Sequence, residues 1–186
     1  TPPWPRKSVN ELFIHYCKIN LLKSKTFPAL KKSAEKLKLD TNGCHNWDDL
    51  FFKIFLNEIE AKLPKNRPIF IYDYPASQAA LAKINPKEPF FAERFELYIS
   101  GIEIANAFSE LIDSKEQLSR LKDEQKLRKK LKKTVFPIDH EFLKSLNHIK
   151  SPCAGIALGV DRLIMLILNK KNIEDVLLFP LSKMIN

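Results

Sequence analysis

Residues 95–110 read FELYISGIEIANAFSE, and this stretch decides the fold because its pattern predicts a β-hairpin. Apolar and polar residues alternate on both sides of Ser100-Gly101, and glycine tolerates the positive φ that a two-residue turn needs. We therefore expect Ile99 to pair with Ile102 across the turn. Successive side chains of a strand point to opposite faces, so the hairpin should have one apolar and one polar face.

The composition of the two faces follows from strict alternation away from the turn. It pairs Tyr98 with Glu103, Leu97 with Ile104 and Glu96 with Ala105. The expected packing face is Phe95, Leu97, Ile99, Ile102 and Ile104, and the other face is Arg94, Glu96, Tyr98, Glu103 and Ala105. Glu96 and Glu103 repel each other unless a cation lies between them, so they predict Mg²⁺ shared with substrate phosphates. The alternative is a solvent-facing surface on which Arg94 is the counter-charge.

Three later residues, Asn106, Phe108 and Glu110, do not fit this alternation. They fall on the apolar face, where an unpaired amide and carboxylate are costly to bury. A β-bulge near Ala105-Asn106 would reverse the alternation and bring all three onto the polar face. An amide, a ring and a carboxylate that converge in this way can hold a substrate ammonium.

A second stretch, residues 155–166, reads GIALGVDRLIML and predicts a glycine-bearing strand that runs directly into an apolar helix. The first backbone N–H groups of a helix are unsatisfied and favour an anion. Arg162 lies in that first turn, and a nucleotide phosphate would be a suitable partner for it. The alternative is a salt bridge between Arg162 and an acidic neighbour. The spacing matches neither a dinucleotide-binding glycine motif nor a P-loop.

The rest of the chain predicts an α+β protein of one domain with an N-terminal appendage. Its 186 residues, 45% of them hydrophobic, are typical of a globular protein. Residues 1–66 are expected to be mostly helical, and residues 67–186 to carry an antiparallel sheet flanked by helices. The three cysteines are widely spaced, which favours free thiols in a cytoplasmic protein. We expect no zinc site, signal peptide or membrane span.

The net charge is +9, and its excess lies in residues 18–38 and in residues 126–133, at the end of a long helix expected from Asp113 to about Lys133. Such an excess is consistent with an anionic partner, either nucleic acid or an acidic protein. The alternative is a solvated helix face.

At this point the residues resemble a known family. Residues 95–111 are similar to the amino-acid-binding strands of lysyl-tRNA synthetases, and residues 155–166 resemble motif 3 of class II aminoacyl-tRNA synthetases, with the apolar helix and residues 176–180 following. The resemblance covers roughly residues 68–180. Residues 75–82, PASQAALA, look like the paralogous elongation factor P lysyltransferases. Ala105 stands where lysyl-tRNA synthetases typically carry glycine, which in the paralogue goes with a preference for β-lysine.

The resemblance implies a role for each matching residue. Glu96 and Glu103 would hold Mg²⁺ and ATP, with Gly155 and Gly159 on the ATP side. Arg162 would bind the γ-phosphate of ATP, so that Arg162 and Glu103 are the expected catalytic residues. Ala105, Asn106, Phe108 and Glu110 would line the lysine pocket, with Glu110 facing the ammonium. The implied reaction forms a lysyl- or β-lysyl-adenylate and transfers the acyl group to a lysine of elongation factor P.

Departures from the family pattern leave two other functions open. Nothing in residues 1–67 resembles motif 1 or motif 2, so this piece alone is expected to be inactive, and a homodimer is expected only of the full-length protein. Ser109 matches the synthetases better than the paralogue. The first alternative is a true lysyl-tRNA synthetase that charges tRNA-Lys. The second is a non-catalytic synthetase-like binding module.

Overall fold

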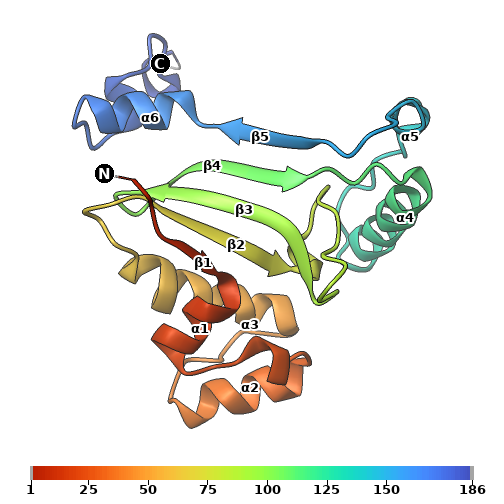
Figure 1. Cartoon of the computed structure of the whole chain (residues 1–186), viewed down its shortest axis with the longest axis horizontal. Helices are drawn as coiled ribbons and strands as arrows, with labels where there is room; N and C mark the ends of the chain where they lie inside the picture. The colour runs from red at the N-terminus through yellow and green to blue at the C-terminus, as the bar shows by residue number, and fades with distance from the viewer. Residues whose placement is uncertain (1, 185–186) are drawn as a thin grey trace.

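The computed structural model describes residues 2–184, and its centre is a five-stranded sheet in the order β1-β2-β3-β4-β5 (Figure 1). The strands are β1 (Arg6–Ser8), β2 (Ile69–Pro75), β3 (Phe91–Ile99), β4 (Ile102–Ser109) and β5 (Ala154–Leu158). β1 runs parallel to β2, and every other neighbouring pair is antiparallel. The predicted α+β class is confirmed. β1 lies in the segment that was predicted to be mostly helical, and this strand was not predicted.

Helices from the N-terminal third cover one face of this sheet (Figure 1). They are α1 (Val9–Cys17), α2 (Phe27–Lys36) and α3 (Trp47–Ile54), joined by short helical turns at Leu21–Lys23, Phe55–Ile59 and Glu60–Lys62. Side-chain caps mark the starts of α1 and α3, and α2 begins with Pro28 in its first turn. Ser8 and Glu11 form a reciprocal capping box on α1, and Asn46 Oδ1 accepts a hydrogen bond from Asp49 N on α3.

The main hydrophobic core lies between these helices and the sheet. The ring of Phe51 is fully buried and stacks on Phe13, with 5.2 Å between their centroids. The same buried cluster continues into the strands through Ile69, Ile71, Tyr74, Phe91 and Tyr98. α1–α3 therefore cover the face that carries Tyr98 and Glu96. The prediction that the opposite face, with Phe95 and Leu97, is the packing surface was wrong. The domain boundary near residue 66 stays a prediction, although one core spans it.

The β3–β4 hairpin has the predicted turn and a bulge, but the bulge comes earlier than expected. Ile99 faces Ile102 and Tyr98 faces Glu103, as predicted. The register then shifts, and Leu97 faces Ala105 while Glu96 faces Asn106. The extra residue is thus Ile104, and the predicted pairs Leu97–Ile104 and Glu96–Ala105 were wrong.

This bulge reverses the alternation of side chains in β4, as we expected from the polar residue Asn106. Asn106 and Phe108 now share the face of Glu96 and Arg94, because they are their direct cross-strand partners. Ala105 moves to the opposite face, where it is 2% exposed. The strand register therefore corrects the expectation that Ala105 lies on the polar face; the residue opposite Asn106 on β5 is Ala157.

The C-terminal part of the chain lies along β5 and at both ends of the sheet (Figure 1). α4 (Ser114–Lys130) and α5 (His140–Leu146) gather at one end, and β5 leads to α6 (Val160–Ile167) at the other. Short 3₁₀ turns follow β2 at Ala76–Gln78 and α6 at Ile173–Asp175 and Leu181–Lys183. Asp113 caps α4 as predicted. Among residues 2–184, no helix is long and apolar enough to cross a membrane.

Large apolar side chains are exposed on this C-terminal part. Leu178 is 92% exposed and Phe179 78%, and Ile156 on the edge strand β5 is 62% exposed. Large apolar side chains exposed to this extent are typical of a surface that another part of a protein covers.

Candidate active site

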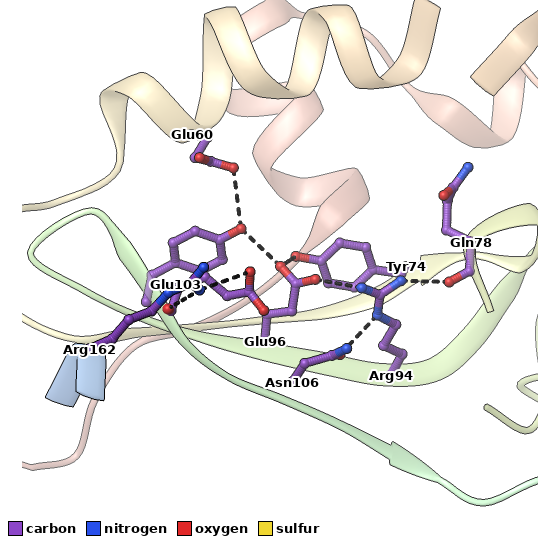
Figure 2. A network of polar contacts seen from close by, with 9 residues as sticks. Glu60, Tyr74, Gln78, Arg94, Glu96, Glu103, Asn106 and Arg162 are labelled. Carbon is purple, nitrogen blue, oxygen red and sulfur yellow. Dashed lines mark hydrogen bonds and ion pairs between the residues drawn. The ribbon is translucent and has the colours of Figure 1, made fainter. Parts of the chain in front are cut away.

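Glu96 lies at the centre of a polar network between β3 and the helices (Figure 2). Tyr74 and Tyr98 donate their hydroxyl hydrogens to Glu96 Oε2, at 2.5 and 2.9 Å. Arg94 Nη2 donates to Oε1 at 2.6 Å. Only 8% of the Glu96 side chain is exposed, so all of these contacts occur in a region that excludes most water. Arg94 is therefore the counter-charge of this buried carboxylate.

Glu103 and Arg162 meet beside this network, although they are far apart in the sequence (Figure 2). Arg162 Nη1 donates to the backbone oxygen of Glu103 at 2.9 Å and lies 3.6 Å from its Oε2 atom. The bulge helps to make this contact. The carbonyl of Ile104 accepts a hydrogen bond from Gly159 N at 2.8 Å, which fixes the start of α6 against β4.

The charges of this cluster perturb its titratable groups. Burial, followed by the negative charge of Glu96, raises the pKa of Glu103, and Arg162 opposes the rise. Burial and the charge of Glu96 also raise the pKa values of Tyr74 and Tyr98. Both phenols therefore keep their protons at neutral pH and act as hydrogen-bond donors.

Mg²⁺ is compatible with this acidic pair. Burial is the main cause of the raised pKa of Glu103, and the negative charge of Glu96 adds to it; a cation between the two carboxylates would relieve that second contribution. The described residues hold no cluster of three or more acidic, histidine or cysteine ligands. Two carboxylates are a typical protein contribution to Mg²⁺ when substrate phosphates and water supply the other ligands.

The expected lysine-binding residues follow along β4 towards β5. Asn106 accepts a hydrogen bond from Arg94 Nε at 3.1 Å, and Phe108 packs against Ala79, Ala82 and Ala92. Residues 79 and 82 belong to the PASQAALA segment, so this segment helps to place the Phe108 ring.

Glu110 comes after the end of β4 and packs on β5. Its backbone N donates to Cys153 O at 2.9 Å, and its carboxylate lies so close to Gly155 that any side chain there would collide with it. Glu110 also lines a hollow of about 510 Å³ with three other acidic residues, Glu93, Asp113 and Glu116. Lys83 also lines the hollow, so acidic residues outnumber basic ones, and the excess of negative charge suits a cationic ligand.

The structure thus brings most of the predicted site residues together in two adjoining groups. Glu96, Glu103 and Arg162 form the charged group, and Asn106, Phe108, Glu110 and Gly155 form the second. Ala105 joins neither group.

Three residues of the network, Glu60, Tyr74 and Gln78, were not predicted; the Tyr98 hydroxyl also lies 3.3 Å from Glu60 Oε2 (Figure 2). Tyr74 was missed because β2 is irregular between Tyr72 and Tyr74, which changes the alternation, and Asp73 has φ of +56° there. Gln78 takes part through its backbone carbonyl, which accepts from Arg94 Nη1, and a sequence pattern carries no signal for such a contact.

The sheet, the bulged hairpin and the strand that leads into α6 with its arginine define a class II aminoacyl-tRNA synthetase-like protein. The model of the family "tRNA synthetases class II (D, K and N)" matches residues 7–183, and the chain therefore belongs to that family.

Similar curated proteins carry a more specific name. The chain is 43% identical over 178 residues to "Elongation factor P--(R)-beta-lysine ligase" of Buchnera aphidicola subsp. Acyrthosiphon pisum (strain Tuc7), covering 95% of the chain and 55% of that protein. It is 45% identical over 156 residues to the protein of the same name from Vibrio atlanticus (strain LGP32), covering 83% of the chain and 48% of that protein. The predicted resemblance to this branch is confirmed. The chain spans about half the length of these relatives.

Proposed function

We propose that the full-length protein activates lysine or (R)-β-lysine with ATP and transfers it to a lysine side chain of elongation factor P. The observation that carries the proposal is the meeting of Arg162 with Glu103 beside Glu96, in a chain whose relatives bear the ligase name. We place this reaction in the cytoplasm and expect a homodimer.

The first step would join the amino acid to AMP. A carboxylate oxygen of the amino acid attacks the α-phosphorus of ATP, and pyrophosphate leaves. Arg162 has one N–H directed at Glu103, and its remaining N–H groups can bind the γ-phosphate. Gly159 lies against the Arg162 side chain and would flank this position on the ATP side, whereas Gly155 lies against Glu110. Glu96 and Glu103 would hold Mg²⁺, which supplies neutralisation of phosphate charge when bound.

The second step would form an amide bond. The amine of the acceptor lysine attacks the carbonyl carbon of the adenylate, AMP leaves, and the amine proton passes to solvent. Asn106, Phe108 and Glu110 would hold the amino acid throughout, with the Glu110 carboxylate facing its side-chain ammonium. Such chemistry depends on positioning and charge neutralisation more than on a covalent nucleophile.

The choice between α- and β-lysine is supported by the relatives' printed name rather than by Ala105. The methyl group of Ala105 lies on the face opposite Asn106, so it can act on the pocket only through packing beneath β4. We favour (R)-β-lysine.

A different acceptor defines the second candidate function, a lysyl-tRNA synthetase that charges tRNA-Lys. The family that matches the chain contains such enzymes by its description, and Ser109 fits them. The third candidate is a non-catalytic synthetase-like module.

Lysine-dependent exchange of pyrophosphate into ATP by the full-length protein tests the activation step. We expect exchange with lysine or (R)-β-lysine and little with aspartate or asparagine as matched controls. Exchange with neither lysine nor β-lysine would favour the non-catalytic module.

A further inference from the structure

Arg94 is the residue that connects the two groups of the candidate site (Figure 2). Its Nη2 donates to Glu96 Oε1 at 2.6 Å, its Nε to Asn106 Oδ1 at 3.1 Å, and its Nη1 to Gln78 O at 2.6 Å. These contacts reach three segments: β3 itself, β4, and the turn after β2. The guanidinium also lies 4.6 Å from the centroid of the Tyr74 ring.

The turn at Gln78 is itself anchored to α3. Asp48 Oδ1 accepts hydrogen bonds from Ser77 Oγ and from Gln78 Nε2, both at 2.6 Å. The backbone carbonyl of Gln78 accepts the hydrogen bond from Arg94 Nη1. Its position is therefore fixed by the bond between the Gln78 side chain and Asp48. The guanidinium of Arg94 is thus held by the turn that is bonded to α3, and it in turn bonds Glu96 and Asn106.

Only an arginine can make this set of contacts. Guanidinium is planar and presents five N–H donors in a rigid fork, whereas the lysine ammonium is a compact group on a flexible stem. The side chain of Arg94 is 17% exposed, so these bonds form largely away from water.

The bond to Asn106 determines how that amide is oriented. Arginine has no acceptor atom, so the amide must turn its oxygen towards Arg94 Nε. Its Nδ2 atom then points away from Arg94 and can only donate. A substrate atom that meets Nδ2 must therefore be an acceptor, such as an oxygen of the amino acid carboxylate, and not the ammonium.

We infer that Arg94 is a positioning residue that aligns Glu96 on the ATP side and Asn106 on the amino-acid side, so that Asn106 donates to the carboxylate end of the substrate. This inference rests on the proposed function for the identity of the substrate. Within the second group of the site, Asn106 then binds the carboxylate end of the substrate and Glu110 binds its ammonium.

Two variants of the full-length protein test this inference. In Arg94→Lys the ammonium cannot reach all three acceptors, and we expect the KM values for both lysine and ATP to rise about ten- to hundred-fold, as is typical when the partner of a ligating side chain is lost. In Asn106→Asp the residue can no longer donate, so binding of lysine should weaken about tenfold or more. Binding of lysinol, which replaces the carboxylate by a hydroxyl, should change less than threefold.

Arg120→Lys is the matched control. Arg120 also donates to two backbone carbonyls, Ala80 O at 3.2 Å and Ala82 O at 2.8 Å, and pairs with Glu116 on its own helix. It contacts neither Glu96 nor Asn106, and its replacement should leave both KM values within twofold.

The readouts are thermal unfolding, exchange kinetics, and calorimetric binding of lysine and lysinol. A folded Arg94→Lys variant with both KM values within twofold of the wild type would overturn the inference. If that variant does not fold, Asn106→Asp decides: equal losses for lysine and lysinol, or no loss for lysine, would overturn it. A wild-type protein that binds lysine without exchange would refute the proposed function while the binding data still decide the role of Arg94. A wild type that does not bind lysine would overturn both.

Discussion

A methyl group added at Gly155 would occupy the space that the Glu110 carboxylate fills. The backbone of Gly155 does not require a positive φ and lies in β5, so alanine fits the strand and the conflict is confined to the side chain of Glu110. In Gly155→Ala this carboxylate must move away from the place where we expect the substrate ammonium.

The magnitude follows from the contact that is lost. A hydrogen bond to a charged group contributes about 1.5–3 kcal/mol. Since each 1.4 kcal/mol is roughly a factor of ten, the KM for lysine should rise about ten- to hundred-fold. The KM for ATP should change much less if Arg162 and Glu103 keep their positions. Lysine-dependent pyrophosphate exchange by the full-length variant measures both.

A second substitution at Glu110 should partly compensate for the methyl group added at residue 155. Glu110→Asp shortens the side chain by one methylene and makes room for the new methyl group. Gly155→Ala/Glu110→Asp should therefore bind lysine better than the product of the two single effects. A folded Gly155→Ala variant whose KM for lysine stays within twofold would refute the placement of Glu110, as would strictly additive effects in the double variant.

Three other perturbations test the core, the electrostatics and the acceptor surface. Phe51→Ala removes a fully buried ring that stacks on Phe13 and should lower the free energy of unfolding by about 3–5 kcal/mol, measured by denaturant titration; a loss below 1 kcal/mol would contradict the core assignment. The raised pKa of Glu103 means that its ionised form destabilises the fold and that this effect grows as pH rises above the ordinary glutamate pKa. Glu103→Gln should therefore raise the melting temperature at pH 7 and lose this advantage as pH falls below about 4.5; the opposite trend would contradict the burial of the Glu103 carboxylate beside the negative charge of Glu96. Charge reversal at Arg128, Lys129 and Lys130, in the last turn of α4, should weaken transfer to elongation factor P more than pyrophosphate exchange if this helix docks an acidic acceptor, and equal losses would indicate a folding defect.

The sequence pattern predicted the hairpin, but not which of its faces is buried. An alternating strand shows that its faces differ, and the more apolar one is normally packed inside. Here α1–α3 pack on the face of Glu96, because Ile69, Ile71 and Tyr98 form one buried apolar cluster with those helices. The charge of Glu96 is compensated by Arg94 and Tyr98 of the same strand and by Tyr74 of β2, and the contact from Tyr74 cannot be read from the hairpin sequence alone.

The existence of a bulge in β4 could be predicted, because strict alternation would have buried Asn106 without a partner. Its position could not, since moving it by one residue leaves Asn106 and Phe108 on the same face and changes only Ala105. The contact that fixes it, between Ile104 O and Gly159 N, joins residues that are distant in the sequence. The same applies to Arg162 and Glu103, for which the pattern left a phosphate and an acidic neighbour as alternatives. The structure pairs them, and a phosphate can still bind the other N–H groups of Arg162.

Apolar side chains are exposed on β5 and on the C-terminal turns. Ile156 and Phe179 would be unfavourable in water if nothing covered them. The relatives are about twice as long as the chain, so the proposed activity belongs to the full-length protein.

The central claim is tested most directly by the mass of the acceptor. Full-length protein is incubated with ATP, (R)-β-lysine or lysine, elongation factor P and tRNA-Lys in one reaction, and the intact mass of elongation factor P is measured beside the acylation of the tRNA. We predict that elongation factor P gains one lysyl-type residue on a lysine side chain while the tRNA stays uncharged. Charging of the tRNA with unmodified elongation factor P would contradict the proposal.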